Sequence, residues 1–164
     1  MKTIKLTQGK ESIVDDEDYQ ELNKYKWFCD SNGYAVRAIT IQSQNKKFGI
    51  KHKQKTILMH KVINNTPEGF ETDHINGIKL DNRKSNLRIA TSSQNKANVG
   101  LRTDNTSGYK GVCWNKKARK WVAQIMFNNE KIYIGYFAKK EQAATAYNTK
   151  ALELFGEFVK LNVI

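Results

Sequence analysis

The chain of 164 residues is long enough for one medium domain or two to three small ones, so its size does not exclude catalysis. Lys and Arg number 28 against 16 Asp and Glu, and the resulting net charge of +12 favours a polyanionic partner such as nucleic acid over an acidic protein. Because the sequence has no apolar run long enough to span a bilayer and no apolar signal core at its start, we expect an intracellular protein without a membrane partner.

The two cysteines, Cys29 and Cys113, lie far apart and form no C-x-x-C pair. Such spacing makes neither a disulfide framework nor a structural zinc site expected. We therefore expect both thiols to be reduced and to have no special role.

The first 58 residues are predicted to form a small α+β unit that contacts DNA. Short β-type runs alternate with turn signals, and S-N-G-Y at Asn32 and Gly33 is typical of a hairpin with a type I′ turn. The segment D-E-D-Y-Q-E-L-N-K-Y-K predicts one short helix with Asp15 or Asp16 as its cap. The polar, basic segment 42–55 is expected to be exposed, either as a strand pair that faces DNA phosphates or as a solvated loop.

Residues 59–98 contain the stretch whose residue types are best suited to catalysis or metal binding, E-T-D-H-I-N-G-I-K-L-D-N-R-K-S-N-L-R-I-A-T-S-S-Q-N. T-D-H-I predicts a strand, the asparagine-rich part a polar loop, L-R-I-A-T a second strand, and S-S-Q-N-K-A-N a short helix capped by Thr91 or Ser92. Asn95 would then lie in or near the first turn of that helix, where it could face Asp73 and His74.

A carboxylate and an amide oxygen are hard ligands that suit Mg²⁺ or Mn²⁺ better than zinc. The neutral imidazole of His74 could accept a proton from water. Since neighbouring strand residues point to opposite faces, Asp73 and His74 would need a local twist or bulge to serve one site. On spacing alone, a turn in which Asn and Asp side chains only cap the backbone remains an alternative.

The segment from Asp73 to Asn95 resembles the HNH endonuclease motif of phage and intron-encoded homing nucleases, in its H-N-N subset, and the agreement extends back to His60. The resemblance implies a ββα-metal core in which His74 is the general base and Asp73 and Asn95 hold one Mg²⁺ or Mn²⁺ ion. It also implies that Asn86 hydrogen-bonds the His74 side chain or backbone and fixes the ring orientation. Many members have histidine where this chain has Asn95, a difference that bears on the preferred metal.

The other polar residues of this stretch are interpreted more simply. Asn76, Asp81 and Asn82 are predicted to be loop-forming residues. His60 is expected to be packed or in contact with a phosphate, and Arg88 is a second candidate for phosphate contact.

Residues 99–108 are rich in Gly, Asn, Thr and Ser, and 99–106 is predicted to be a linker before a domain at 107–164. K-W-V-A-Q-I-M-F and K-I-Y-I-G-Y-F predict two strands, and K-K-E-Q-A-A-T-A-Y-N-T-K-A-L-E-L-F-G predicts a helix that ends before Gly156. The buried stripe of this helix is expected at Ala144, Tyr147, Ala151 and Leu154. On the first of these strands, Trp121, Ala123, Ile125 and Phe127 alternate onto the face expected to pack on the helix.

Residues 107–162 resemble the DNA-binding domain of plant APETALA and ethylene-response factors, on Y-K-G-V, K-W-V-A-Q-I, Y-I-G-Y-F, E-Q-A-A-T-A-Y and the closing L-N. The resemblance implies a three-stranded antiparallel sheet that packs one face on a helix and lays the other in the major groove. The chain lacks several arginines of the plant proteins, so their GC-rich target is not carried over. The candidate DNA contacts are Lys110, Trp114, Lys116, Arg119, Gln124, Met126, Lys131 and Tyr133.

The sequence thus predicts an α+β protein with an N-terminal α+β unit, a ββα-metal core and a C-terminal three-stranded sheet packed on one helix. The predicted function is a site-directed, metal-dependent DNA endonuclease of the homing type that nicks one strand per active site and leaves 5′-phosphate and 3′-hydroxyl ends. We expect a monomer rather than a dimer, double-stranded DNA as partner, no small-molecule cofactor, and the cytoplasm of a bacterium or phage-infected host as location. Two alternatives are a non-enzymatic DNA-binding regulator with a degenerate HNH scaffold and a nuclease that acts on branched or damaged DNA or on RNA.

Overall fold

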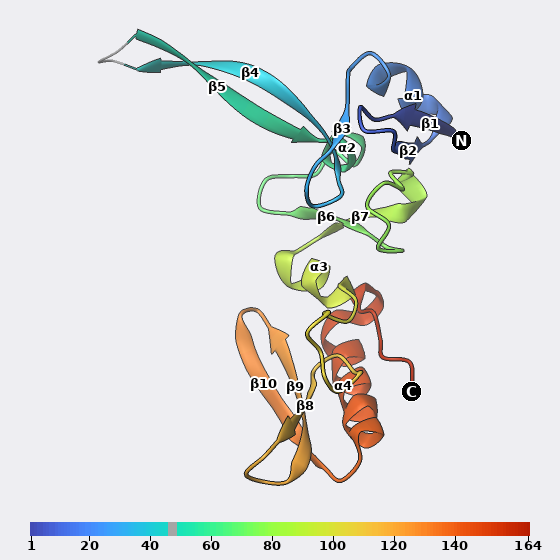
Figure 1. The fold of residues 1–164 in the computed structure, drawn as a ribbon, viewed down its shortest axis with the longest axis vertical. Coiled ribbons are helices and arrows are strands. Elements are labelled where there is room, and N and C mark those ends of the chain that lie inside the picture. The colour runs from blue at the N-terminus through green and yellow to red at the C-terminus, as the bar shows by residue number, and fades with distance from the viewer. Residues whose placement is uncertain (46–48) are drawn as a thin grey trace. The chain divides into compact units, whose positions relative to one another are not determined.

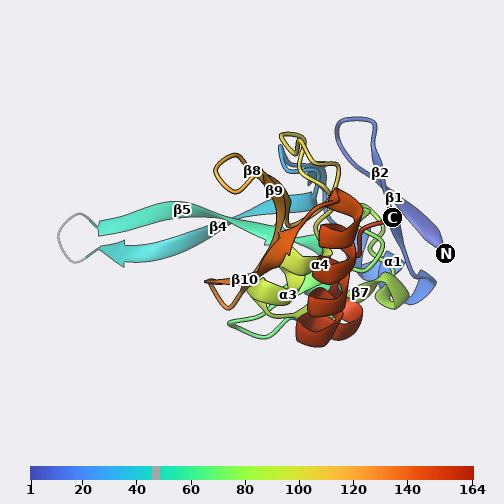
Figure 2. The same cartoon turned by 90° about the horizontal axis from the view of Figure 1, so that it is seen from below.

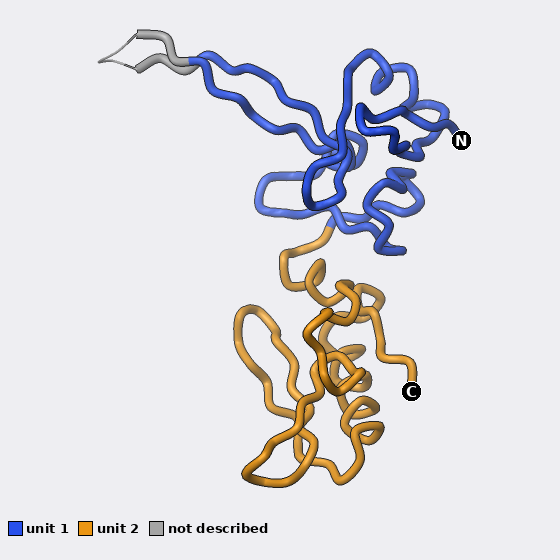
Figure 3. The backbone as a smooth tube through the Cα atoms, viewed as in Figure 1, with its two compact units in different colours: residues 1–89 blue, residues 90–164 orange. Residues whose placement is uncertain are grey.

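The computed structural model describes residues 1–45 and 49–164, with side chains outside 43–51. Its backbone separates into two compact units, Met1–Ile89 and Ala90–Ile164 (Figure 3). The strand that carries Asp73 and His74 and nearly all of the strand at 87–90 belong to the first unit, whereas the helix that follows them falls in the second. The finer division into 1–58, 59–98, 99–106 and 107–164 remains a prediction.

The first unit begins with a hairpin, a helix and a three-stranded sheet (Figure 1). The order in the three-stranded sheet is β3-β4-β5, and all its neighbours are antiparallel. The elements are β1 (Lys2–Lys5), β2 (Glu11–Val14), α1 (Asp16–Leu22), β3 (Phe28–Cys29), β4 (Ala35–Asn45), β5 (Gly49–Leu58) and α2 (Met59–Ile63). The predicted N-terminal helix is confirmed, and Asp15 stands at its N-cap. Segment 42–55 lies in β4 and β5, apart from residues 46–48, which are outside the described residues.

One apolar cluster joins these elements. Ile4 and Val14 from the hairpin, Leu22 from α1, Trp27, and Met59 from α2 are all buried in it. The Trp27 indole N–H donates to the carbonyl oxygen of Leu22 at 2.8 Å, so the one polar atom of this large side chain is satisfied inside the core. The cluster fixes the β3–β5 sheet and α2 against the hairpin.

The S-N-G-Y turn differs from its prediction. A type I′ turn needs positive φ at both central residues, but of these two described residues Gly33 alone has it, at 88°. The carboxylate of Asp30 instead accepts hydrogen bonds from the backbone N–H groups of Asn32, at 3.0 Å, and Tyr34, at 2.8 Å. The predicted type I′ turn is therefore wrong, because a side chain of the preceding strand end organises a longer loop.

The segment that carries Asp73 and His74 forms another two-stranded sheet of β6 (Glu71–His74) and β7 (Leu87–Ala90), with the short 3₁₀ helix η1 (Lys84–Asn86) before β7. The loop between the strands is docked on β2: the Ile13 N–H donates to the Leu80 carbonyl and the Asn82 N–H donates to the Ile13 carbonyl, both at 2.8 Å. Leu80 also packs on the apolar cluster of the first unit. The loop is thus part of the folded core and is held by backbone bonds.

The second unit consists of α3 (Ser92–Asn98), a sheet of β8 (Val112–Asn115), β9 (Lys120–Phe127) and β10 (Glu130–Phe137), α4 (Lys140–Phe155) and the 3₁₀ helix η2 (Gly156–Phe158). The sheet is antiparallel in the order β10-β9-β8, and α4 lies against it (Figure 2). The predicted strands and helix are confirmed, as are Thr91 as the cap of α3 and Gly156 after α4.

The α4–sheet contact explains a glycine in Y-K-G-V. A Cβ atom on Gly111 would lie 2.1 Å from the Tyr147 ring and 2.6 Å from the Gln124 carbonyl oxygen, and the φ of Gly111 is 71°. Tyr147, Ala143, Ala144 and Ala151 form the buried stripe of α4, and Leu154 is packed at its edge. Only glycine therefore lets α4 approach the sheet this closely.

Within the described residues, no helix combines the length and the apolar character needed to cross a membrane.

Candidate active site

His74 ends β6 inside the first unit and is only 5% exposed. Its Nε2 atom lies 2.9 Å from the Oδ1 atom of Asn82. The ring also meets the edge of the His60 ring, with centroids 5.1 Å apart, and lies 6.0 Å from the Tyr34 ring. The backbone of β6 and these packed rings leave the imidazole little freedom to turn.

The hydrogen-bond network around Asn82 favours one tautomer of the His74 imidazole. Asn82 is fully buried, and its Nδ2 atom donates to Ser12 Oγ at 2.7 Å. Ser12 Oγ in turn donates to the Leu80 carbonyl at 3.1 Å. Asn82 therefore presents its oxygen to His74, and this arrangement favours the tautomer with the hydrogen on Nε2.

Burial lowers the pKa of His74 below its ordinary value, while the hydrogen bond with Asn82 opposes this shift. The ring is thus neutral at physiological pH and can act as a base. Burial, and then the nearby His74, lower the pKa of His60 to about 3, and His60 is 4% exposed between Tyr34 and His74. This placement favours the packing role of His60 over a phosphate contact.

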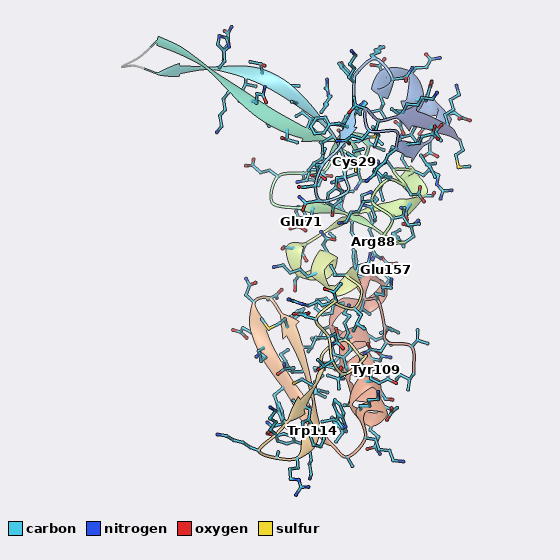
Figure 4. All side chains as sticks on the ribbon, viewed as in Figure 1. Cys29, Glu71, Arg88, Tyr109, Trp114 and Glu157 are labelled. Carbon is cyan, nitrogen blue, oxygen red and sulfur yellow. The ribbon has the colours of Figure 1, made fainter. Side chains whose placement is uncertain are left out.

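Asp73 is 3% exposed and forms an ion pair with Arg88 of β7 (labelled in Figure 4). The Nε and Nη2 atoms of Arg88 both lie 2.8 Å from Asp73 Oδ2. A buried carboxylate needs such compensation, so the main visible role of Arg88 is to neutralise Asp73. A carboxylate has about four lone-pair positions, so one that is held by an arginine can also accept a hard cation.

Asp73 and His74 have different side-chain partners, as the alternation of strand residues predicts. In the part of the chain that the structure describes, no group of three or more His, Cys, Asp or Glu side chains is arranged to hold a metal. A metal site built on Asp73 would need amide oxygens as further ligands, and this donor set suits Mg²⁺ or Mn²⁺.

Asn86 stabilises the loop rather than the imidazole ring. Its Oδ1 accepts from the Asn76 N–H at 3.0 Å and its Nδ2 donates to the Asp81 carbonyl at 2.8 Å. Its backbone carbonyl accepts from the N–H of Ile75, the residue after His74, at 2.9 Å. Asn86 thus positions the backbone beside His74, while Asn82 supplies the side-chain bond to Nε2 of the ring.

The interpretation of Asn82 as a simple turn residue was wrong. Asn76 is a loop-forming residue: its Oδ1 accepts from the Ile78 N–H and its Nδ2 donates to Asp81, each at 2.8 Å. Asn82 looks the same in sequence but points inward to His74 and Ser12. No local signal separates the two asparagines, because the contacts of Asn82 come from distant segments of the chain.

Asn95 lies on α3, where its N–H donates to the Thr91 carbonyl at 2.9 Å. Asp73 and His74 belong to the first compact unit and Asn95 to the second. Neither unit by itself brings the three residues together, so the role of Asn95 as a ligand stays a prediction.

The candidate DNA contacts of the C-terminal sheet fall into two groups. Gln124 and Tyr133 are opposite one another in the β9–β10 register, as are Met126 and Lys131. The alternate residues Ala123, Ile125, Ile132 and Ile134 pack in the core with α4, which leaves these four on the other face. Tyr133 and Met126 are 52% and 53% exposed. Lys116 and Arg119 are exposed in the turn between β8 and β9.

Lys110 and Trp114 have other partners. The Lys110 ammonium donates to the carbonyl oxygens of Ala97, Val99 at 2.8 Å and Lys160 at 3.3 Å, and burial lowers its pKa to about 8. Trp114 is opposite Trp121 in the register, and their rings meet edge-on with centroids 5.2 Å apart. Both placements favour packing within the second unit over DNA contact.

The comparisons with known proteins identify the family of the chain. Residues 65–97 match the family model described as HNH endonuclease. The chain is 32% identical over 157 residues to a protein of Acanthamoeba polyphaga mimivirus named as an uncharacterized HNH endonuclease, L560; the similarity covers 96% of this chain and 77% of that protein. It is also 32% identical over 94 residues to Protein 3.8 of Escherichia phage T7, covering 57% of this chain and 77% of that protein. With a similarity that covers nearly its whole length, the chain belongs to the HNH endonuclease family and is a nuclease.

Proposed function

We propose that this HNH endonuclease is a site-directed, divalent-metal-dependent DNA endonuclease of the homing type. The observation behind the proposal is the buried His74, which follows the Asp73 carboxylate in β6 and whose Nε2 atom lies 2.9 Å from the Asn82 oxygen. The resemblance of the motif to phage and intron-encoded homing nucleases and the net charge of +12 support DNA as the substrate.

His74 would take a proton from the attacking water at Nδ1. As the ring becomes an imidazolium, the bond from Nε2–H to the Asn82 oxygen strengthens, because the donor is now charged. Asn82 and Ser12 therefore hold the ring in place and favour its charged form at the moment of proton transfer. Asn86 would keep the backbone after His74 in position, so it is a positioning residue in this account.

Asp73 and Asn95 would hold the metal, as the family resemblance implies. A bound Mg²⁺ or Mn²⁺ ion supplies positive charge beside the scissile phosphate and the departing 3′ oxygen. Arg88 would limit the negative charge on Asp73 and so tune the affinity of the site for the ion. One such site serves one strand, so a monomer would nick DNA and leave 5′-phosphate and 3′-hydroxyl ends, and a double-strand break would need a second site.

The outer face of the β8–β10 sheet would hold the duplex, as the resemblance to the APETALA and ethylene-response factors suggests. Gln124, Lys131 and Tyr133 combine amide, basic and aromatic groups on that face, and Lys116 and Arg119 add cations at its end. Such groups contact base edges and phosphates in the major groove. Separated contacts of this kind suit recognition of a long site, because each base contact adds only ~1 to 3 kcal/mol.

The test uses supercoiled plasmid that carries the DNA flanking the coding sequence of this protein, with Mg²⁺ or with EDTA. We expect nicking that needs the metal and maps to one sequence, and a loss of nicking in His74→Ala by ~10²-fold or more while DNA binding survives. Asp73→Asn should raise the Mg²⁺ concentration needed for half-maximal nicking, whereas Asp104→Asn, which removes an exposed carboxylate paired with Arg102, should not.

Nicking that persists in EDTA would contradict metal dependence. Equal cleavage of unrelated plasmids, or preferred cleavage of branched DNA or RNA, would contradict a homing-type, site-directed enzyme and support a nuclease directed by substrate structure.

A further inference from the structure

The strands β4 and β5 form a two-stranded ribbon that extends away from the rest of the first unit (Figures 1 and 2). Ala35 and Val36 at its base are fully buried, and Ile57 packs on the apolar cluster. From Ala38 and Thr56 outward, the described side chains are exposed or, in the case of Ile39, half-buried. An isolated two-stranded ribbon is only marginally stable in water, so an extended one is expected to serve a partner.

The register sorts the side chains of the ribbon into two chemically different faces. Opposite residues of an antiparallel pair share a face, and alternate residues along a strand do too. One face carries short or neutral polar side chains, and the described ones are Ala38, Thr40, Gln42, His52, Gln54 and Thr56. The other face pairs Ile39 with Lys55 and Ile41 with Lys53.

The charge of the ribbon has one sign. Between residues 35 and 58 the sequence has no Asp or Glu. At the base of the ribbon, the guanidinium of Arg37 packs on aromatic rings, 3.6 Å from the centroid of the Tyr25 ring and 5.5 Å from that of Trp27. Lys53 and Lys55 are exposed. The ribbon is therefore complementary to a polyanionic partner. Its uncharged polar face can form hydrogen bonds with neutral donor and acceptor groups of that partner.

We propose that the ribbon lies in the major groove of the target DNA, with Thr40, Gln42, His52, Gln54 and Thr56 facing the base edges. The inference rests on double-stranded DNA as the substrate in the proposed function. The major groove, about 12 Å wide, admits a two-stranded ribbon, and glutamine reads adenine through its N6 and N7 edges. Lys53 and Lys55, on the other face, have side chains long enough to bend toward the phosphates at the groove walls.

The ribbon would read a short segment of the site. At ~3.4 Å per residue, the four steps from Ala38 to Gln42 span roughly 14 Å, which is the rise of about four base pairs. Gln42 and Gln54 are diagonal neighbours on the face that would contact the bases, here called the reading face. Because each glutamine can bind an adenine, we expect adenines close together within that segment.

The experiment selects binding sites from a random-sequence DNA duplex library with the full-length protein in EDTA, so that cleavage plays no part. The test variant is Gln42→Thr with Gln54→Thr, which keeps polar, strand-forming residues but shortens both amides. The matched variant from the other face is Lys53→Gln with Lys55→Gln. Thermal melting checks that both variants fold like the wild type.

We expect the glutamine variant to lose the preference for adenines within a segment of about four base pairs and to keep the rest of the selected site. The lysine variant should keep the whole site, bind more weakly and show a smaller salt dependence, by about two units of slope. A fully preserved site in the glutamine variant would overturn the inference. Enrichment by the wild type from a random RNA library, with none from duplex DNA, would overturn it too.

These outcomes are independent of the catalytic proposal. A protein that selects a site through the ribbon but does not nick it with Mg²⁺ would contradict the proposed function and leave the reading face supported. A protein that nicks one sequence while the glutamine variant retains the full preference would support the proposed function and contradict the inference about the ribbon.

Discussion

The two compact units differ in how many polar side chains they bury beside their apolar cores. Among the residues that the structure describes, the buried polar and charged ones are Ser12, His60, Thr72, Asp73, His74, Asp81, Asn82, Asn86 and Ser107. All of these except Ser107 belong to the first unit. The second unit has an interior of aliphatic, alanine and aromatic side chains between α4 and its sheet.

This difference matches the places proposed for the catalytic base, inside the first unit, and for the outer-sheet DNA contacts, on the second. A buried polar group destabilises a fold unless it is hydrogen-bonded, so a connected network of buried polar groups indicates a functional site. In the first unit that set surrounds the proposed base. In the second unit the polar and basic groups lie instead on the outer face of the sheet and in the β8–β9 turn, where a ligand can reach them.

Gly111→Ala should give the largest effect on stability and would show how far the units fold independently. Its Cβ would collide with the Tyr147 ring and the Gln124 carbonyl at a φ of 71°, for an expected loss of ~3 kcal/mol or more. Gly108→Ala is the control, because Gly108 has a φ of 82° but open space where a Cβ would lie, so its expected loss is ~1 to 2 kcal/mol. Urea unfolding followed by Trp fluorescence and hydrogen exchange measures both. Equal losses in the two variants would contradict the close α4–sheet contact.

Asn82→Ala tests the polar interior of the first unit. Removing the amide leaves His74 Nε2 and Ser12 Oγ without these bonds, so we expect nicking to fall ~10- to 100-fold, with a loss of ~1 to 3 kcal/mol in stability. Asn76→Ala is the matched change at the loop surface and should reduce nicking much less. The measurement is single-turnover nicking of the selected site at saturating protein. Similar rates for Asn82→Ala and wild type would show that the ring does not depend on Asn82.

The secondary structure and the packing of the second unit were predicted from sequence because strand alternation and the helical stripe are local patterns. β9, β10, α3 and α4 were predicted in this way, and Thr91 and Gly156 marked helix ends, whereas β8 was implied by the family resemblance. The partner of His74 could not be predicted, since Asn82 reaches it only after the loop docks on β2. Family spacing pointed to Asn86, whose side chain stabilises the loop instead.

His60 should make the first unit sensitive to acid. Its pKa is about 3 in the folded protein and near 6.5 unfolded, so between these values the unfolded chain binds one more proton. The contribution of His60 to the free energy of unfolding is then fully present above pH ~6.5 and falls by about 1.4 kcal/mol per pH unit as the pH drops toward 3. Urea unfolding at a series of pH values measures the slope, and His60→Gln should make it shallower by that amount. An unchanged slope would mean that His60 is protonated in the fold.

Lys116→Gln with Arg119→Gln should have the smallest effect and tests the surface of the second unit. We expect binding to the selected site to weaken and the slope of log affinity against log salt to become shallower by about two, with the preferred sequence unchanged. Lys150→Gln with Lys139→Gln removes the same charge from α4 and its N-cap and serves as the control. Equal slopes in both double variants would place the DNA elsewhere than on the β8–β9 turn.

The most direct test of the account is the protonation state of His74, read from ¹⁵N-detected histidine NMR spectra at pH 7. His74→Ala identifies its signals. The hydrogen bond to the Asn82 oxygen predicts a neutral ring with the proton on Nε2 and an unprotonated Nδ1. A ring with the proton on Nδ1, or a charged ring at pH 7, would contradict His74 as a base that is held in place by Asn82.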